Sequence, residues 1–234
     1  MHKSLHRFFI LHSRAYRETS AIITAFSLES GKISFVAKGV KSTRNKLRVL
    51  TEPFIPMTVE LSGNSELKNS YSMDSDGMGM VLSGIHLYCG IYINELLTRV
   101  LPSEEPDQAL YSAYQQTITR LAKQESPEPI LREFEFFLLQ QMGYAVEFNV
   151  DAESGEDIEE FQRYRYVAET GLIKTKQMDP KHSFAGADLR DISHQNWHVA
   201  SLLAAKQISR LAFAPLLGAK PLKSRELFQA APHQ

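Results

Sequence analysis

Cysteine is nearly absent from this 234-residue chain, which has only Cys89. A single cysteine excludes an internal disulfide and every zinc site built from several thiolates, and it fits a reducing compartment. Long apolar runs are also missing, because the most apolar segment, residues 77–93, contains a histidine and is shorter than a membrane span. The first residues lack the uninterrupted apolar stretch of a signal peptide. We therefore expect a cytoplasmic protein without membrane contact.

Motifs of catalysis are equally scarce. Neither Gly-x-Ser-x-Gly nor Gly-x-Gly-x-x-Gly occurs in the chain. Residues 65–68 have the Ser-x-x-Lys spacing, but they are expected at the start of a strand rather than of a helix, so we interpret the match as chance. His194 and His198 are four residues apart, as metal ligands on one helix face would be, yet a third ligand is not evident. The sequence predicts no enzyme, no bound metal and no cofactor.

The net charge is close to zero, at -1, but it is unevenly distributed. Residues 1–50 carry ten lysines and arginines against two acidic residues, whereas the rest of the chain has an excess of nine acidic side chains. This asymmetry predicts an N-terminal part that binds a polyanion, attached to a body with other duties. Chance clustering on a solvated surface is the alternative.

The N-terminal part has the pattern of a small β-barrel. Five short segments, separated by turn residues, alternate apolar and polar residues or are rich in β-branched residues: 7–15, 22–28, 32–38, 57–61 and 67–73. A sheet of this size must protect its edges, and closure into a barrel does so. We therefore predict an α+β fold whose first domain, residues 1–78, is a five-stranded oligonucleotide-binding barrel (OB-fold).

The remaining residues, 79–234, are predicted to form an α-helical domain with a small β insertion. Apolar residues cover every side of residues 78–101, as in a buried helix. They form one stripe or a short run in the other predicted helical segments, which are 106–121, 127–143, 197–218 and 222–230. Between the segments 127–143 and 197–218, residues 147–160 are acidic and predict a loop. A small hairpin is expected at residues 164–174.

Basic residues concentrate directly after the predicted strand of residues 32–38. Five cations fall in an eleven-residue loop that cannot pack inside the protein: Lys38, Lys41, Arg44, Lys46 and Arg48. Such side chains would neutralise phosphates with little dependence on base sequence. Arg14 and Arg17 add charge from the first strand, and Tyr16 between them either packs on the barrel or offers a ring for an unpaired base. We expect the DNA-binding residues here.

Several segments closely resemble the RecO family of bacterial DNA repair proteins, in the same order over almost the whole chain: residues 11–20, 31–32 with 36–41, 50–54, 92–97, and 134–135 with 142–144. The resemblance implies an N-terminal OB-fold, a helical C-terminal domain and work as a recombination mediator near the nucleoid. Such a mediator binds single- and double-stranded DNA, anneals complementary strands and helps RecA displace single-stranded-DNA-binding protein (SSB), together with RecR and sometimes RecF.

One departure from the family concerns zinc. Many relatives carry a four-cysteine zinc motif after the third helix, where residues 149–157 of this chain contain no cysteine. Zinc is therefore not expected to bind there in the family's manner. We predict that residues 149–184 form a loop and a small hairpin held by hydrogen bonds and packing.

A second site is predicted on the late helix, where apolar and cationic residues share one face: Val199, Leu202, Leu203, Lys206 and Arg210. The RecO resemblance implies contact with the SSB tail, which is acidic and ends in an aromatic residue. Such tails bind apolar surfaces rimmed by Lys or Arg. Arg132, Lys220 and Lys223 are expected to complete the rim. The alternative is that Lys206 and Arg210 are solvated side chains whose stems cover the apolar strip.

The preferred interpretation is a non-enzymatic, DNA-binding mediator with annealing activity. An RNA- or ribosome-binding factor built on the same barrel is the main alternative, and it predicts a preference for structured RNA. A metal-dependent nuclease that uses Glu66, Asp74 and Asp76 is the third possibility, and it predicts cleavage that depends on Mg²⁺.

Overall fold

The chain divides into two compact units, each described separately below. The computed structural model describes residues 4–40, 51–63, 65–179 and 182–230. The first unit comprises residues 1–125 together with 222–234, and the second comprises residues 126–221. The second unit is therefore inserted into the chain of the first. The domain boundary predicted after residue 78 lies inside the first compact unit, between the barrel and the helices that follow it. It stays a prediction.

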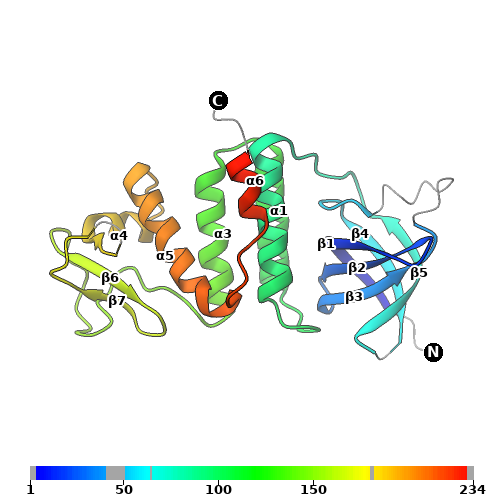
Figure 1. The fold of residues 1–234 in the computed structure, drawn as a ribbon, viewed down its shortest axis with the longest axis horizontal. Coiled ribbons are helices and arrows are strands. Elements are labelled where there is room, and N and C mark those ends of the chain that lie inside the picture. The colour runs from blue at the N-terminus through cyan, green and yellow to red at the C-terminus, as the bar shows by residue number, and fades with distance from the viewer. Residues whose placement is uncertain (1–3, 41–50, 64, 180–181, 231–234) are drawn as a thin grey trace. The chain divides into compact units, whose positions relative to one another are not determined.

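Five strands close into a barrel in the first unit, as predicted (Figure 1). They are β1 (Ser4–Tyr16), β2 (Ser20–Ser27), β3 (Gly31–Ala37), β4 (Met57–Ser62) and β5 (Leu67–Ser75). The order around the barrel is β1-β2-β3-β5-β4, with β3 and β5 parallel and the other pairs antiparallel. Alternate residues such as Ile23, Phe35 and Val59 fill the interior. This closed five-stranded topology confirms the predicted OB-fold.

Three helices complete the first unit: α1 (Gly84–Val100), α2 (Gln108–Ala122) and α6 (Ser224–Ala230). In Figure 1, α6 lies beside α1, and the two helices are in contact. The prediction that the first helix begins at residue 78 was wrong, because residues 76–83 are not helical. The Met80 amide donates instead to the Phe54 carbonyl at 2.9 Å, and an added Cβ at Gly79 would come within 2.9 Å of Ile55.

A β-bulge in β1 divides the outer face of the barrel into a covered half and an open half. The pairing of β1 with β2 changes register between Ile10 and His12. Before the bulge, Phe9 and Phe26 are covered by aromatic residues of α2, and the rings of Phe9 and Tyr114 lie 5.2 Å apart. Beyond the bulge, the outer side chains of β1 are exposed or half-buried.

A buried asparagine of α1 fastens the helices to this bulge. Asn94 donates from Nδ2 to the carbonyl oxygens of Ile10 and Leu11, at 3.3 and 3.4 Å. Its Oδ1 accepts a hydrogen bond from the Tyr114 hydroxyl at 2.8 Å. Burial raises the pKa of Tyr114, so its hydroxyl keeps the proton that it donates. The barrel and its helices are therefore joined by a satisfied polar contact as well as by aromatic packing.

The second unit combines three helices with a small sheet. Its elements are α3 (Pro127–Gln141), β6 (Arg163–Val167), β7 (Gly171–Lys174), β8 (Phe184–Ala185), α4 (Gly186–Ser193) and α5 (Val199–Leu217), and the sheet order is β7-β6-β8. The β6–β7 hairpin confirms the predicted β insertion. The sequence did not predict β8 and α4, since they are too short to show a clear period. No described helix has both the length and the apolarity needed to cross a membrane.

One carboxylate closes the loop of residues 149–157, where the sequence predicts that no zinc binds. Asp151 is buried, and its Oδ1 accepts hydrogen bonds from the amides of Glu153 and Ser154 at 2.9 and 3.4 Å. Its Oδ2 accepts from the amide of Lys174 in β7 at 3.2 Å. Both oxygens therefore serve backbone donors, and the loop has no thiolate, so its residues do not fit a zinc ion. Nowhere in the described residues do three or more His, Cys, Asp or Glu side chains form a group that would hold a metal.

Candidate nucleic-acid interface

The strand register gathers cationic, aromatic and apolar residues on the open half of the barrel. Arg14 is opposite Ile22, Ile22 is opposite Val36, and Val36 is opposite Asn69, so these four side chains form a row across β1, β2, β3 and β5. Ile22 and Val36 are half-buried and form an apolar floor, whereas Arg14 and Asn69 are exposed at its ends. We call this row and the next one toward the β1–β2 turn the open face.

The next row contains two tyrosines and a lysine. Tyr16 pairs with Ser20 at the end of the β1–β2 hairpin, and Lys38 directly follows Ala37, the partner of Ala21. Lys38 is two residues beyond Val36 in β3. Tyr71 is two residues beyond Asn69 in β5, and Asn69 is the parallel partner of Val36. Lys38 is exposed, Tyr16 is half-buried and Tyr71 is 54% exposed. The barrel therefore holds cations and aromatic rings side by side over an apolar floor.

Arg17 lies in the β1–β2 turn and covers Tyr16. Its φ of 54° is in the left-handed region, and its Cζ is 5.1 Å from the centroid of the Tyr16 ring. A guanidinium at this distance makes a favourable cation–π contact, which fixes the side chain near the ring. A base that stacks on Tyr16 would therefore meet the arginine as well.

Half of the predicted DNA-binding residues come together at this end of the barrel: Arg14, Tyr16, Arg17 and Lys38. The other four predicted residues lie outside the described part of the chain: Lys41, Arg44, Lys46 and Arg48.

Sequence reasoning missed Tyr71. Strict alternation would place Tyr71 on the same side as Met73, inside the barrel. The β4–β5 register shifts at this point, however, since Ser70 and Ser72 are paired and Tyr71 between them is not. A bulge of this kind re-aims a side chain, and no signal in the sequence marks it.

The second predicted site is partly assembled on α5. Val199 and Leu203 are 77% and 55% exposed, and Lys206 and Arg210 are exposed on the same side of the helix. We call these four residues the α5 strip. Leu202 is half-buried beside it, and Lys220 is exposed just after the helix.

Two residues expected in the rim of that site have other roles. Arg132 is buried and donates to Glu135 Oε1 at 2.8 Å, so it does not extend an exposed rim as expected. Lys223 belongs to the first unit, where its amide donates to the Glu95 carboxylate at 2.9 Å.

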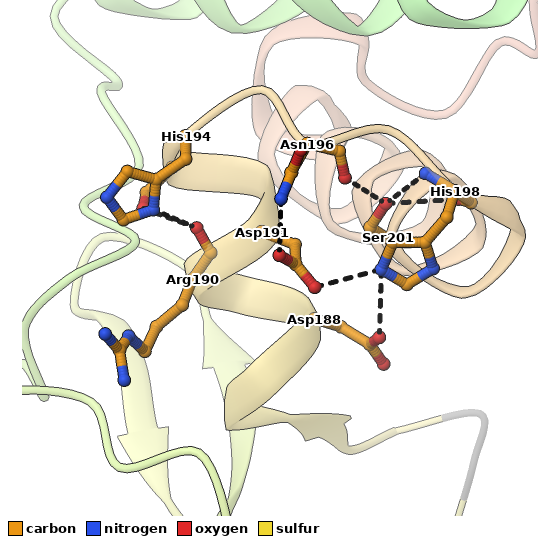
Figure 2. A network of polar contacts seen from close by, with 8 residues as sticks. Asp188, Arg190, Asp191, His194, Asn196, His198 and Ser201 are labelled. Carbon is orange, nitrogen blue, oxygen red and sulfur yellow. Dashed lines mark hydrogen bonds and ion pairs between the residues drawn. The ribbon is translucent and has the colours of Figure 1, made fainter.

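A polar network holds the start of α5 against α4 (Figure 2). His198 caps α5 and exchanges hydrogen bonds with Ser201, and its Nε2 lies 3.0 Å from Asp191 and 4.0 Å from Asp188. The hydrogen bond from His198 lowers the pKa of Asp191. His194 instead caps the end of α4, with Nδ1 2.7 Å from a backbone oxygen of that helix. The two histidines therefore do not share a helix face and do not form the metal pair that their spacing suggested.

The acidic residues of the nuclease alternative are spread along β5. Glu66 precedes the strand, and Asp74 and Asp76 are near its end. Eight residues of extended chain span about 26 Å, far more than the reach of one metal ion. The arrangement does not favour a common metal site.

Comparison with known proteins agrees with the barrel and the helical region. Family models for the N-terminal and the C-terminal parts of recombination protein O match residues 1–75 and 82–226. The chain belongs to the RecO family. The DNA repair protein RecO of Pseudoalteromonas atlantica is 42% identical over 94% of this chain and 92% of its own length. The proteins of that name from Aliivibrio fischeri strain MJ11 and from Salmonella dublin are 42% and 43% identical, over 97% and 95% of this chain and 96% and 93% of their own lengths.

Membership in the RecO family has consequences for function. The family is one of DNA repair and recombination proteins and is not a family of known enzymes. The resemblance expected from the sequence is thereby confirmed, and so are the barrel and the helical region that it implied.

Proposed function

We propose that this protein is a recombination mediator that binds single- and double-stranded DNA, anneals complementary strands and assists RecA loading on SSB-coated DNA. RecR and, for some steps, RecF are its proposed partners, and the nucleoid is its proposed location. The open face carries this proposal, because it joins cations and aromatic rings on an OB-fold in a family of DNA repair proteins. No catalytic step and no cofactor are part of the proposal.

Annealing needs a surface that lowers the repulsion between two phosphate backbones and leaves the bases free to pair. Arg14 and Lys38 would neutralise phosphates without reading the base sequence. Tyr16 and Tyr71 would stack on unpaired bases, which a duplex does not offer. The proposed surface therefore holds single strands by charge and stacking, and duplexes by charge.

The experiment on charge is a salt titration of single-strand binding. Replacing Lys41, Arg44 and Lys46 with alanine should reduce the slope of log K against log[salt] by roughly 2–3, at about 0.7–0.9 per lost phosphate contact. A matched control replaces three exposed cations elsewhere with alanine: Lys123, Arg165 and Lys176. An unchanged slope in the first variant, or an equal change in the control, removes these residues from the DNA site.

The experiment on stacking compares single-stranded with duplex DNA at one salt concentration. Tyr71→Ala should weaken single-strand binding by about 1–3 kcal/mol and leave duplex binding nearly unchanged. Tyr71→Phe keeps the ring and should keep the affinity. Equal weakening on both DNA forms would show that Tyr71 does not stack on bases.

The RNA-binding alternative is separated by filter binding and strand annealing in parallel. The mediator should anneal complementary DNA strands and should not prefer structured RNA at equal salt. A clear preference for structured RNA without annealing would favour the alternative.

We also propose that the α5 strip binds the acidic tail of SSB. Exposed Val199 and Leu203 next to Lys206 and Arg210 suit an aromatic residue followed by a carboxylate. Lys206→Glu with Arg210→Glu should weaken binding of a tail peptide at least tenfold, or about 1.4 kcal/mol, in fluorescence anisotropy. DNA affinity should change much less, and Arg165→Glu with Lys176→Glu is the control of equal charge. Wild-type peptide affinity in the α5 double variant would reject this site.

A further inference from the structure

An aromatic side chain of the second unit is almost fully in solvent on a firmly held turn. Phe161 is 96% exposed. The Gln162 amide donates to the Glu159 carbonyl at 3.2 Å, and the Glu159 amide donates to the Tyr164 hydroxyl at 2.9 Å. Gly186 donates to the Gln162 carbonyl at 2.9 Å and packs so closely that an added Cβ would lie 1.9 Å from the Glu159 oxygen. We call residues 159–162 the Phe161 turn.

Two ion pairs hold the Phe161 turn from outside. Glu159 pairs with Lys174 at 2.6 Å, and Glu160 pairs with Arg190 at 2.5 Å. Because the backbone of the turn is already ordered, docking would cost mainly the freedom of the two side-chain torsions of Phe161, and an aromatic ring buries a large apolar area in an interface. The Phe161 turn therefore has the properties of a preformed docking anchor.

The charge around the Phe161 turn indicates what it binds. Residues 151–160 contain six acidic side chains and no basic one. Asp151 is buried and two glutamates are in the ion pairs above, so the exposed acidic charge comes from Glu153, Glu156 and Asp157. This charge repels phosphate backbones and favours a surface that combines apolar groups with lysine or arginine. The expected receptor is therefore a protein surface rather than DNA.

A surface of that chemistry exists on the same unit. The α5 strip presents exposed Val199 and Leu203 beside the cationic Lys206 and Arg210. Phe161 remains exposed although both features belong to one compact unit, so the two do not meet within one copy. We propose that the Phe161 turn of one copy docks on the α5 strip of a second copy, an inference that rests on the proposed role of the strip as a receptor for acidic aromatic segments.

This contact joins two different surfaces, and each copy offers one of each. A two-fold dimer would make the contact twice, and a head-to-tail arrangement would make it once for each neighbouring pair, in open chains or closed rings. A tail peptide would compete with the Phe161 turn, because both use the α5 strip. The terminal carboxylate of the tail, which the turn lacks, would give the peptide an additional contact with the cations of the strip, so the peptide would release the copies from one another. Self-association and tail binding are then mutually exclusive uses of one surface.

The experiment is sedimentation velocity of the full-length protein over a concentration series. Wild type should associate, and Phe161→Ser should raise the dissociation constant at least tenfold, as should Lys206→Glu with Arg210→Glu. Met178→Ser is the control, since this side chain is also apolar and 75% exposed in the same unit. A mixture of the Phe161 variant with the α5 variant has one intact turn and one intact strip, so it should form dimers and nothing larger.

Each outcome decides the proposal. Wild type that stays monomeric up to its solubility limit overturns it, and so does association that Phe161→Ser leaves unchanged. If wild type is monomeric but tail peptide still binds the strip, the self-association fails and the proposed tail site stands. If the α5 variant loses association but keeps peptide affinity, the tail site fails and the contact between copies stands.

Discussion

The barrel of the first unit and the inserted second unit differ in what holds their interiors together. Inside the barrel, apolar side chains alternate along paired strands, and the strand ladder satisfies the backbone polar groups. In the second unit, a buried ion pair joins Arg132 to Glu135 on α3, and the Ser209 hydroxyl of α5 donates to Glu135 Oε2 at 2.5 Å. The barrel interior follows one repeated pattern, whereas the second unit combines an apolar core, which includes Phe148, Leu189 and Ile208, with a few specific buried polar contacts.

The same difference separates the two proposed interfaces. The open face is a set of neighbouring residues that the barrel register brings together. Loss of one of its cations should remove only one phosphate contact among several and weaken DNA binding by a small step. In the proposed contact between copies, one aromatic side chain on a turn held by polar contacts docks on the α5 strip, so the loss of Phe161 alone should have a large effect. The predictions below test whether the second unit really depends on its polar contacts more than the first does.

The largest effect is expected from Glu135→Ala. This change leaves the guanidinium of Arg132 buried without its carboxylate partner, which should lower the free energy of unfolding by about 3–5 kcal/mol. Denaturant unfolding measures the loss. The double variant Arg132→Met with Glu135→Leu removes both charges and should be much less destabilised. Equal losses in the single and double variants would mean that packing, rather than the ion pair, holds α3 to α5.

A smaller effect is expected from Asp151→Ala. Three backbone amides would lose their acceptor, and the free energy of unfolding should fall by about 1–3 kcal/mol. Hydrogen exchange should become faster at the amides of Glu153, Ser154 and Lys174, which Asp151 accepts from. Glu153→Ala, an exposed change in the same loop, is the control and should leave both measurements unchanged.

The buried ion pair of α3 illustrates why the second unit was harder to predict than the barrel. The barrel strands follow from a period of two, and the β6–β7 hairpin follows from β-rich runs around a Thr-Gly turn. In contrast, the pairing of Arg132 with Glu135 at an α3–α5 contact depends on which helices meet, and no local pattern reports that. An arginine that looked like part of an exposed rim is therefore buried.

The failures inside the first unit have the same cause. The start of α1 was misplaced because Gly79 packs on Ile55 and Met80 bonds to Phe54, and both partners lie more than twenty residues away. Tyr71 was missed since a bulge in β5 turns it outward against its alternation. Local periodicity predicts elements well, but it does not predict the irregularities by which distant segments adjust to one another.

The third prediction concerns a polar contact in the first unit. Burial of Glu95 raises the pKa of its carboxyl, but hydrogen bonds from Ser224 and the Lys223 amide outweigh it, so the net pKa is below the ordinary 4.5. A lowered folded-state pKa stabilises the fold above about pH 4.5, and this contribution is lost as the pH falls through the lowered value. Solvent screening limits it to about 1 kcal/mol.

The measurement is hydrogen exchange of α6 amides between pH 6 and pH 3, referred to intrinsic rates. Protection of α6 should decrease in acid before the barrel opens. Glu95→Gln should lower the protection already at pH 6 and remove most of its pH dependence, whereas Glu226→Gln on the exposed side of α6 should not. An acid response that persists in Glu95→Gln would assign the effect to another group.

No effect at all is expected when metal is removed from the second unit. Both oxygens of Asp151 accept backbone hydrogen bonds, and a zinc ion would have to displace them and find further ligands in a loop without cysteine. Protein purified without a histidine tag should contain less than one zinc per chain in elemental analysis, and a chelator should leave the melting temperature unchanged. Stoichiometric zinc, or a fall in the melting temperature with chelator, would show that a metal rather than hydrogen bonds stabilises the second unit, and the contrast with the barrel would then have a different origin.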